Sequence, residues 1–234
     1  KIAQNAAHYA VQKPDEVTDM VNFKEPEVSG TDLKAPVYID FGPTSLSATP
    51  WNNITSHQES STSSWIKDAE NNYTNIGVRV LGGFTATHAG VGSEPASPVT
   101  VDDVEFPLTA WKDGLLVGGE KNKGDVGPGR IEISQLDASR KYNFTILAIR
   151  FNGSKDARIS SYKLVAKTES EVKEVKTGIK DVAAFNAANF EEYIAKFENV
   201  EPDSEGKVIV EVKGIDTGLA AEGHINALCI SPVK

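Results

Sequence analysis

The sequence has almost no sulfur, with one cysteine and one methionine in 234 residues. A single cysteine excludes an intrachain disulfide framework and any zinc site built from paired cysteines. Cys229 lies in the apolar run 225–230, where a free thiol commonly behaves as a small buried hydrophobic side chain rather than a reactive nucleophile. The low sulfur content is compatible with an oxidising, extracytoplasmic environment.

Excess positive charge and long apolar runs are also absent. The formal net charge is −9, which argues against a nucleic-acid partner because phosphate binding needs clustered Lys and Arg. No run approaches the ~18 apolar residues of a membrane-spanning helix. Neutral, hydroxyl-rich ligands such as glycans stay open.

Catalytic motifs are missing as well. There is no Gly-x-Ser-x-Gly elbow and no His-Glu-x-x-His motif, and the four histidines lie far apart in the sequence. Glu169 with Glu171, or Glu191 with Glu192, could supply a carboxylate pair for glycoside hydrolysis. Acids in such polar stretches are more typical of a solvated face. We therefore expect no enzymatic activity.

What the sequence does contain is a series of short alternating segments separated by Gly, Pro, Ser and Asn clusters, the pattern of β-strands and turns. The segment 142–151 is apolar on both faces at its centre, as in a strand covered on two sides. A helical turn is expected within 106–113. These patterns predict an all-β antiparallel sandwich, with strands at 37–41, 76–81, 130–137, 142–151, 159–165, 208–213 and 225–230.

The alanine-rich segment 181–197 gives two conflicting signals. Propensity alone favours a helix, whereas Tyr193, Ala195 and Phe197 alternate with more polar neighbours. Because the flanking sequence is β-like, we expect a loop followed by a strand from about 192 to 200.

The chain divides into two parts. Residues 1–35 are polar and contain breakers, so we expect an N-terminal arm or linker, and residues 36–234 are expected to form one sandwich domain. The long Ser-, Thr-, Asn- and Gly-rich stretches 43–75 and 82–106 are expected to be loops, which often carry function. The start at Lys1 predicts a mature or truncated form.

Several segments occur in an order that is similar to a known family. They are residues 37–42 with 50–53, 106–113, 142–150, 200–206 and 223–228. Together they resemble the galactose-binding-like (malectin-like) jelly-roll domains of secreted Bacteroides-type proteins, over roughly residues 36–232. The resemblance implies an antiparallel jelly-roll sandwich, commonly tied to carbohydrate binding.

The aromatic and amide side chains of the loops form the first candidate site. Indole faces stack on the apolar face of a pyranose, and amides hydrogen-bond its hydroxyls. All three tryptophans lie in or beside the long loops, where ligand contacts gather. The alternative is that each ring fills an end of the sandwich beneath its own loop. The predicted ligand-binding residues of this group are Trp51, Asn52, Asn53, Trp65 and Trp111.

Arg150 and Arg158 flank the hairpin 151–157 and are predicted to support the same site. A guanidinium can hold a hydroxyl or carboxylate of a ligand in a forked contact. The alternative is pairing with local acids, for which Asp156 and Asp113 are available.

Three acids are candidate cation ligands. Asp40 lies in the middle of a predicted strand, where an unpaired carboxylate is costly, so it could bind a structural calcium ion. A buried hydrogen bond to a loop backbone is the alternative. Asp102 and Asp103 form a weaker candidate, and no other cofactor is expected.

These observations predict a non-catalytic carbohydrate-binding module that is secreted or anchored at the cell surface of a bacterium, in the periplasm or on the outer membrane. Its expected partner is an oligo- or polysaccharide. The first alternative is a structural or adhesion module that contacts another protein. The second is a glycan-active hydrolase with an unrecognised carboxylate pair.

Overall fold

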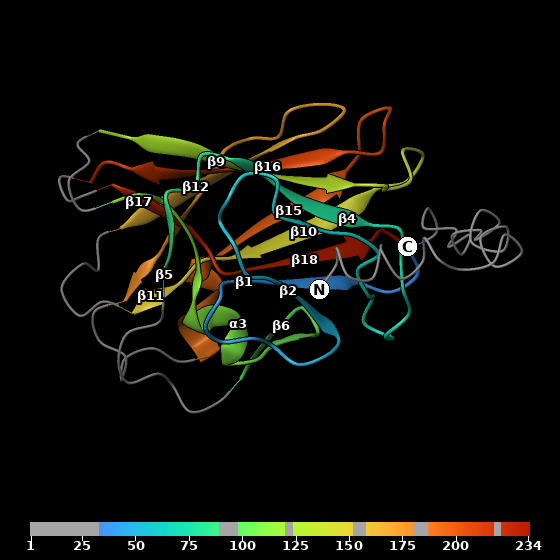
Figure 1. The fold of residues 1–234 in the computed structure, drawn as a ribbon, viewed down its shortest axis with the longest axis horizontal. Coiled ribbons are helices and arrows are strands. Elements are labelled where there is room, and N and C mark those ends of the chain that lie inside the picture. The colour runs from blue at the N-terminus through green and yellow to red at the C-terminus, as the bar shows by residue number, and fades with distance from the viewer. Residues whose placement is uncertain (1–32, 89–97, 120–123, 152–157, 180–186, 218–220) are drawn as a thin grey trace, which may run out of the picture.

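A computed structural model of the chain describes residues 33–88, 98–119, 124–151, 158–179, 187–217 and 221–234. The predicted arm lies outside these residues, apart from 33–35. Two sheets dominate the described part (Figure 1). The five-stranded sheet has the order β15 (Ile194–Val200), β10 (Tyr142–Leu147), β18 (Ala227–Pro232), β1 (Val37–Phe41) and β2 (Trp51–Ile54). The six-stranded sheet has the order β13 (Lys173–Lys176), β12 (Ile159–Val165), β16 (Val208–Ile215), β9 (Val126–Ser134), β4 (Gly77–Gly82) and β3 (Thr62–Ser63).

The remaining elements are short. A three-stranded sheet has the order β17 (Glu222–Ile225), β8 (Gly114–Gly118) and β5 (Ala86–His88), and β6 (Val99–Val101) pairs with β7 (Val104–Phe106). β11 (Arg150–Phe151) and β14 (Gly178–Ile179) form a parallel pair. The helical elements among the described residues are α3 (Thr109–Lys112) and the 3-10 helix η2 (Ala187–Tyr193). None of them is long and apolar enough to cross a membrane.

The inner faces of the two large sheets bury one apolar core. In β10, Tyr142, Phe144 and Ile146 face this core, because side chains two apart point to the same side of a strand. From the other sheet, β16 contributes Val208 and Val210 in the same way. The antiparallel pairings within both sheets confirm the predicted all-β sandwich.

From β9 onward the long strands alternate between the two sheets. β9, β12 and β16 belong to the six-stranded sheet, whereas β10, β15 and β18 belong to the five-stranded one. Successive long strands therefore cross from one layer to the other, apart from the hairpin of β12 and β13 within the six-stranded sheet. The strands β1 and β2 are the parallel exception within the five-stranded sheet.

A second apolar cluster covers part of the outer face of the five-stranded sheet, and we call it the aromatic cluster. Its large members are Trp51, Phe106, Trp111, Phe190 and Tyr193. Trp51 belongs to β2 of the sheet itself, whereas the other four come from β7, α3 and η2, which lie against this side of the sheet (Figure 1). This cluster explains why β10 is apolar on both faces at its end.

Most predicted strands are confirmed, and two are divided: 142–151, and 225–230, where β17 ends at Ile225 and β18 begins at Ala227. β1 and β12 have the predicted bounds, α3 supplies the expected helical turn, and β15 begins two residues after the predicted start at 192. The predicted continuous strand 142–151 is wrong, because it is divided after Leu147. The side chain of Asn226 accepts a hydrogen bond from the Ile149 N–H at 2.7 Å and replaces the strand partner there.

Candidate functional site

Trp111 and Trp51 lie inside the aromatic cluster. Trp111 is 1% exposed and meets Phe190 edge to face, with ring centroids 5.5 Å apart. Trp51 is 9% exposed and stacks on Tyr38 at 5.2 Å. For these two rings the structure favours the alternative in which each tryptophan fills space beneath its own loop.

The amides of Asn52 and Asn53 bind backbone rather than point to solvent. Asn52 donates to the carbonyls of Tyr38 and Lys67 and accepts from the Lys67 N–H at 2.8 Å. Asn53 both donates to and accepts from the backbone of Ser47. Both residues therefore hold loops in place, and one of those loops carries the third tryptophan.

Trp65 lies at the start of a two-stranded ribbon, residues 65–76. The ribbon is closed by an antiparallel bridge between Lys67 and Tyr73 and by a hydrogen bond from the Thr74 N–H to the Ile66 carbonyl. Ile66, Asp68, Thr74 and Ile76 are buried, and the residues between them face solvent. This alternation gives the ribbon one inner and one outer face.

The outer face of the ribbon carries two exposed aromatic rings. Trp65 is 44% exposed and Tyr73 is 62% exposed. The Lys67 ammonium lies 5.0 Å from the centre of the Tyr73 ring, which is a cation–π contact. Trp65 has a φ of 55°, in the left-handed region that bulky residues rarely adopt. Trp65 was predicted from the sequence and Tyr73 was not, although Trp65, Lys67 and Tyr73 alternate with buried neighbours.

Arg150 and Arg158 are brought together by Glu222, a residue that was not among the predicted site residues. Arg150 Nη1 lies 2.8 Å from Glu222 Oε2, and Arg158 forms an ion pair with the same oxygen. Arg158 and Glu222 are almost fully buried. The two arginines therefore pair with Glu222 and not with Asp113, one of the two acids predicted for them. Asp113 accepts a hydrogen bond from the Thr44 N–H instead. Asp156 lies outside the described residues. The sequence does hold a signal for this residue, because Glu222 is the one acid in the mainly apolar stretch 221–230.

His224 completes this ionic cluster. Its Nε2 lies 3.3 Å from Glu222 Oε2, and its ring meets His88 edge to face at 4.9 Å. Burial lowers the pKa of His224 well below its usual value, and the charges of Arg150 and Arg158 lower it further. The imidazole is therefore neutral, and the charge of the cluster lies on the arginines and the glutamate.

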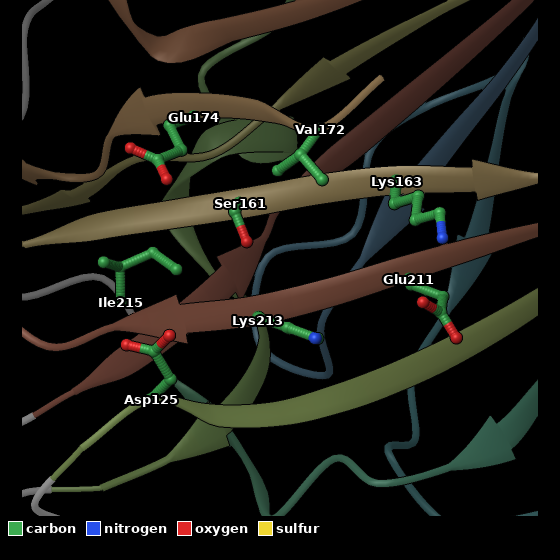
Figure 2. A pocket seen from close by; sticks show the side chains of 8 residues that line it. All are labelled: Asp125, Ser161, Lys163, Val172, Glu174, Glu211, Lys213 and Ile215. Atoms are coloured by element: carbon green, nitrogen blue, oxygen red, sulfur yellow. The ribbon is translucent and has the colours of Figure 1, made fainter. Parts of the chain in front are cut away.

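A shallow groove of about 310 Å³ lies on the outer face of the six-stranded sheet (Figure 2). Its floor is formed by side chains of β12, β13 and β16, in which Ser161 stands opposite Glu174 on one side and Lys213 on the other. Lys163 stands opposite Glu211, which is paired with Arg130 at 2.8 Å. The described residues that line the groove include no aromatic side chain. It offers hydrogen-bonding groups but no stacking surface.

The predicted cation ligands separate into two places. Asp102 and Asp103 have φ values of 48° and 64° and form the two-residue turn between β6 and β7, a position where positive φ is required. Asp102 is also paired with Lys196 at 2.6 Å. Asp40 is 1% exposed and accepts a hydrogen bond from the Ser47 N–H. Across the described residues, no three His, Cys, Asp or Glu side chains gather as metal ligands would.

Comparison with known proteins gives distant structural likenesses only. No family model matches the chain, and no curated protein sequence matches it. The carbohydrate-binding module TmCBM61, solved with β-1,4-galactotriose, is 13% identical over 52% of this chain and 72% of its own, with a TM-score of 0.30. The ANXUR1 extracellular domain and the ANX2 ectodomain of Arabidopsis thaliana are 8% and 10% identical, with TM-scores of 0.44 and 0.42.

The two plant matches cover 86% and 66% of this chain. The chain spans 48% and 42% of the length of those ectodomains, so it matches less than half of each. At these identities and TM-scores, the structural similarities do not indicate what the chain binds.

Proposed function

We propose that this domain binds a glycan on the outer face of the ribbon 65–76, without catalysis of its own. The observation that carries the proposal is the pair of exposed aromatic side chains, Trp65 and Tyr73, on one face of one ribbon. Aromatic rings supply flat apolar area that matches the C–H face of a pyranose, and adjacent polar groups supply hydrogen bonds to hydroxyls.

The contacts around the ribbon fit this role. Asn52 binds the backbone of Lys67 through both its donor and its acceptor, which fixes the ribbon against β2. Buried Ile66 and Ile76 anchor its inner face. A site held in this way loses little freedom on binding, which favours affinity. The left-handed backbone at Trp65 is a further support, because such outliers are enriched at binding sites.

We also propose that the domain has no catalytic activity of its own. The buried carboxyls Asp40 and Asp113 are 1% and 0% exposed and cannot reach a glycan. The carboxylate of Glu211 in the groove is already paired with Arg130. The resemblance of the sequence to galactose-binding-like jelly-roll domains also favours binding without hydrolysis. An extracytoplasmic place, secreted or anchored at a bacterial surface, follows from the proposed ligand.

Affinity electrophoresis through gels that contain neutral and acidic polysaccharides, β-1,4-galactan among them, tests the proposal. We expect retardation by at least one polysaccharide with a millimolar to micromolar Kd, roughly 4–8 kcal/mol of binding free energy. The double variant Trp65→Ala/Tyr73→Ala is expected to weaken retardation at least about tenfold, because a stacked ring contributes on the order of 1–2 kcal/mol.

Val172→Ala is the matched control, since Val172 is an exposed apolar side chain (59%) at the groove and not on the ribbon. It is expected to migrate as the wild type does. If every polysaccharide leaves the wild type unretarded, or if the double variant is retarded equally, the ribbon is not a glycan site. If only Val172→Ala lost retardation, the glycan site would lie in the groove and not on the ribbon.

A further inference from the structure

The floor of the groove on the outer face of the six-stranded sheet carries a hydroxyl group that the fold does not use. Ser161 of β12 lies there and is only 4% exposed. Its hydroxyl is directed into the groove, toward the space between β12 and β16 (Figure 2). Among the described residues, no protein group forms a hydrogen bond with this hydroxyl. Native structures rarely leave a nearly buried polar group without a partner, so this one points to a ligand.

Two side chains of opposite charge flank this hydroxyl in one row across the sheet. Glu174 of β13 stands opposite Ser161 on one side, and Lys213 of β16 stands opposite it on the other. Both are exposed, and neither forms an ion pair within the part of the chain that the structure describes. Because neighbouring strands are about 4.8 Å apart, the backbones of Glu174 and Lys213 are about 10 Å apart and leave a gap above Ser161. We call these three residues the polar row.

The other charged side chains of the groove already have partners. Lys163 forms an ion pair with Glu169, and Glu211 forms one with Arg130 at 2.8 Å. Asp125 accepts a hydrogen bond at 2.9 Å from the backbone N–H that follows β16. The unused hydrogen-bonding groups of the groove are therefore those of the polar row.

We propose that the groove is a second glycan site, separate from the ribbon, and that the polar row binds the hydroxyl groups of one neutral sugar residue. The Glu174 carboxylate accepts a hydrogen bond from one hydroxyl, the Lys213 ammonium donates to another, and the Ser161 hydroxyl can do either. Hydrogen bonds to charged groups are stronger than those between neutral groups. The volume of about 310 Å³ is at the small end of the roughly 300–1,000 Å³ of ligand sites, which suits a single sugar residue.

Other classes of ligand fit the groove less well. A polyanion such as a nucleic acid needs clustered cations, whereas the described lining residues bring three carboxylates and two ammonium groups. A peptide that adds a strand needs a free sheet edge, whereas β12 and β16 are paired on both sides. A sugar that stacks needs an aromatic ring, which the described lining does not offer. The groove therefore binds hydroxyl groups, whereas the ribbon binds the flat face of a sugar ring.

Nuclear magnetic resonance of isotope-labelled protein tests the proposal, with the methyl glycosides of glucose, galactose, mannose and xylose as probes. Each probe is titrated to about 50 mM, because a site made of a few hydrogen bonds is expected to bind with a roughly millimolar Kd. At least one probe is expected to shift the backbone amide signals of Ser161 and Lys213 in a saturable way. The same shifts should persist in Trp65→Ala/Tyr73→Ala, because the ribbon is a separate site.

Ser161→Ala removes the hydroxyl and should weaken binding of the same probe about fivefold, the effect of one lost hydrogen bond. Because no described residue bonds to this hydroxyl, the Tm of the variant should stay within about 3 °C of the wild type. Glu174→Ala/Lys213→Ala removes both ends of the polar row and should weaken binding more than about tenfold. Two controls should bind as the wild type does: Val172→Ala, which leaves the polar row intact, and Glu105→Ala, which removes an exposed acid of β7 outside the groove.

The proposal is overturned if none of the four probes shifts the amide signals of the groove, or if Ser161→Ala binds the probe as tightly as the wild type does. It is also overturned if Ser161→Ala lowers the Tm by more than about 3 °C, because the hydroxyl would then stabilise the fold. Shifts confined to amides of the ribbon would support the first glycan site and overturn the second. Shifts confined to the groove would support the second and contradict the first.

Discussion

Trp111 and Trp65 both lie in or beside long polar loops, yet the first is 1% exposed and the second is 44% exposed. Trp111 stands on α3 and packs against Phe190 of η2 in the aromatic cluster. Trp65 begins a ribbon whose inner positions are already occupied by Ile66 and Ile76. Local position on an element, and not residue type or loop composition, therefore decides whether a tryptophan is buried in the fold or stays exposed.

The two groups of rings also differ in their polar neighbours. In the aromatic cluster, Trp51 contacts other rings, Tyr38 and Phe106. On the ribbon, Tyr73 has the Lys67 ammonium above its ring instead. Aromatic neighbours exclude water, whereas a charged neighbour keeps the surface hydrated, so the ribbon can stay exposed without becoming an aggregation site.

The largest expected effect is the loss of stability in Trp111→Ala. Removing a buried indole leaves a cavity in the aromatic cluster, and the free energy of unfolding should fall by about 3–5 kcal/mol. Urea denaturation followed by circular dichroism measures it. A fall below about 1 kcal/mol would contradict the buried position of this ring.

A smaller effect on stability is expected from Trp65→Ala. Because the ring is largely exposed, the free energy of unfolding should change by roughly 1 kcal/mol or less. The same substitution should remove the part of the tryptophan fluorescence that iodide quenches, since Trp51 and Trp111 are shielded. If iodide still quenches the variant strongly, one of the other two rings is accessible and the contrast fails.

The smallest effect is expected from Lys67→Gln. The substitution removes the cation above Tyr73 and should lower the stability of the ribbon by about 0.5 kcal/mol. Adding salt should diminish the difference from the wild type in thermal unfolding, because exposed charges are screened. A loss that salt does not change would point to packing of the lysine stem instead.

Much of the fold follows from local pattern. The alternation in 37–41 and 159–165 predicts the bounds of β1 and β12 to the residue, because a slip of one residue would turn the side chains that face the main core away from it. The division of 142–151 was hidden, since it depends on Asn226 from the far end of the sequence. A distant side chain that replaces a strand–strand hydrogen bond leaves no pattern in the sequence of the strand that it interrupts.

The candidate site follows less readily from the sequence. Trp65 was predicted from its place in a polar loop, but Tyr73 becomes its neighbour only through the Lys67–Tyr73 bridge. Arg150 and Arg158 were predicted to act together, and the structure brings them to one carboxylate, Glu222. That pairing joins segments far apart in sequence, so composition and spacing alone could not supply it.

The alternation of the long strands between the two layers has a consequence for cooperativity. Each sheet is assembled from pieces scattered along the chain, with β1 beside β18 and β4 beside β9. The five-stranded sheet joins β1 and β2 to β18 from the other end of the described chain, and neither layer can melt while the other keeps its inner face covered. The domain is therefore expected to unfold in a single step, as an indivisible unit.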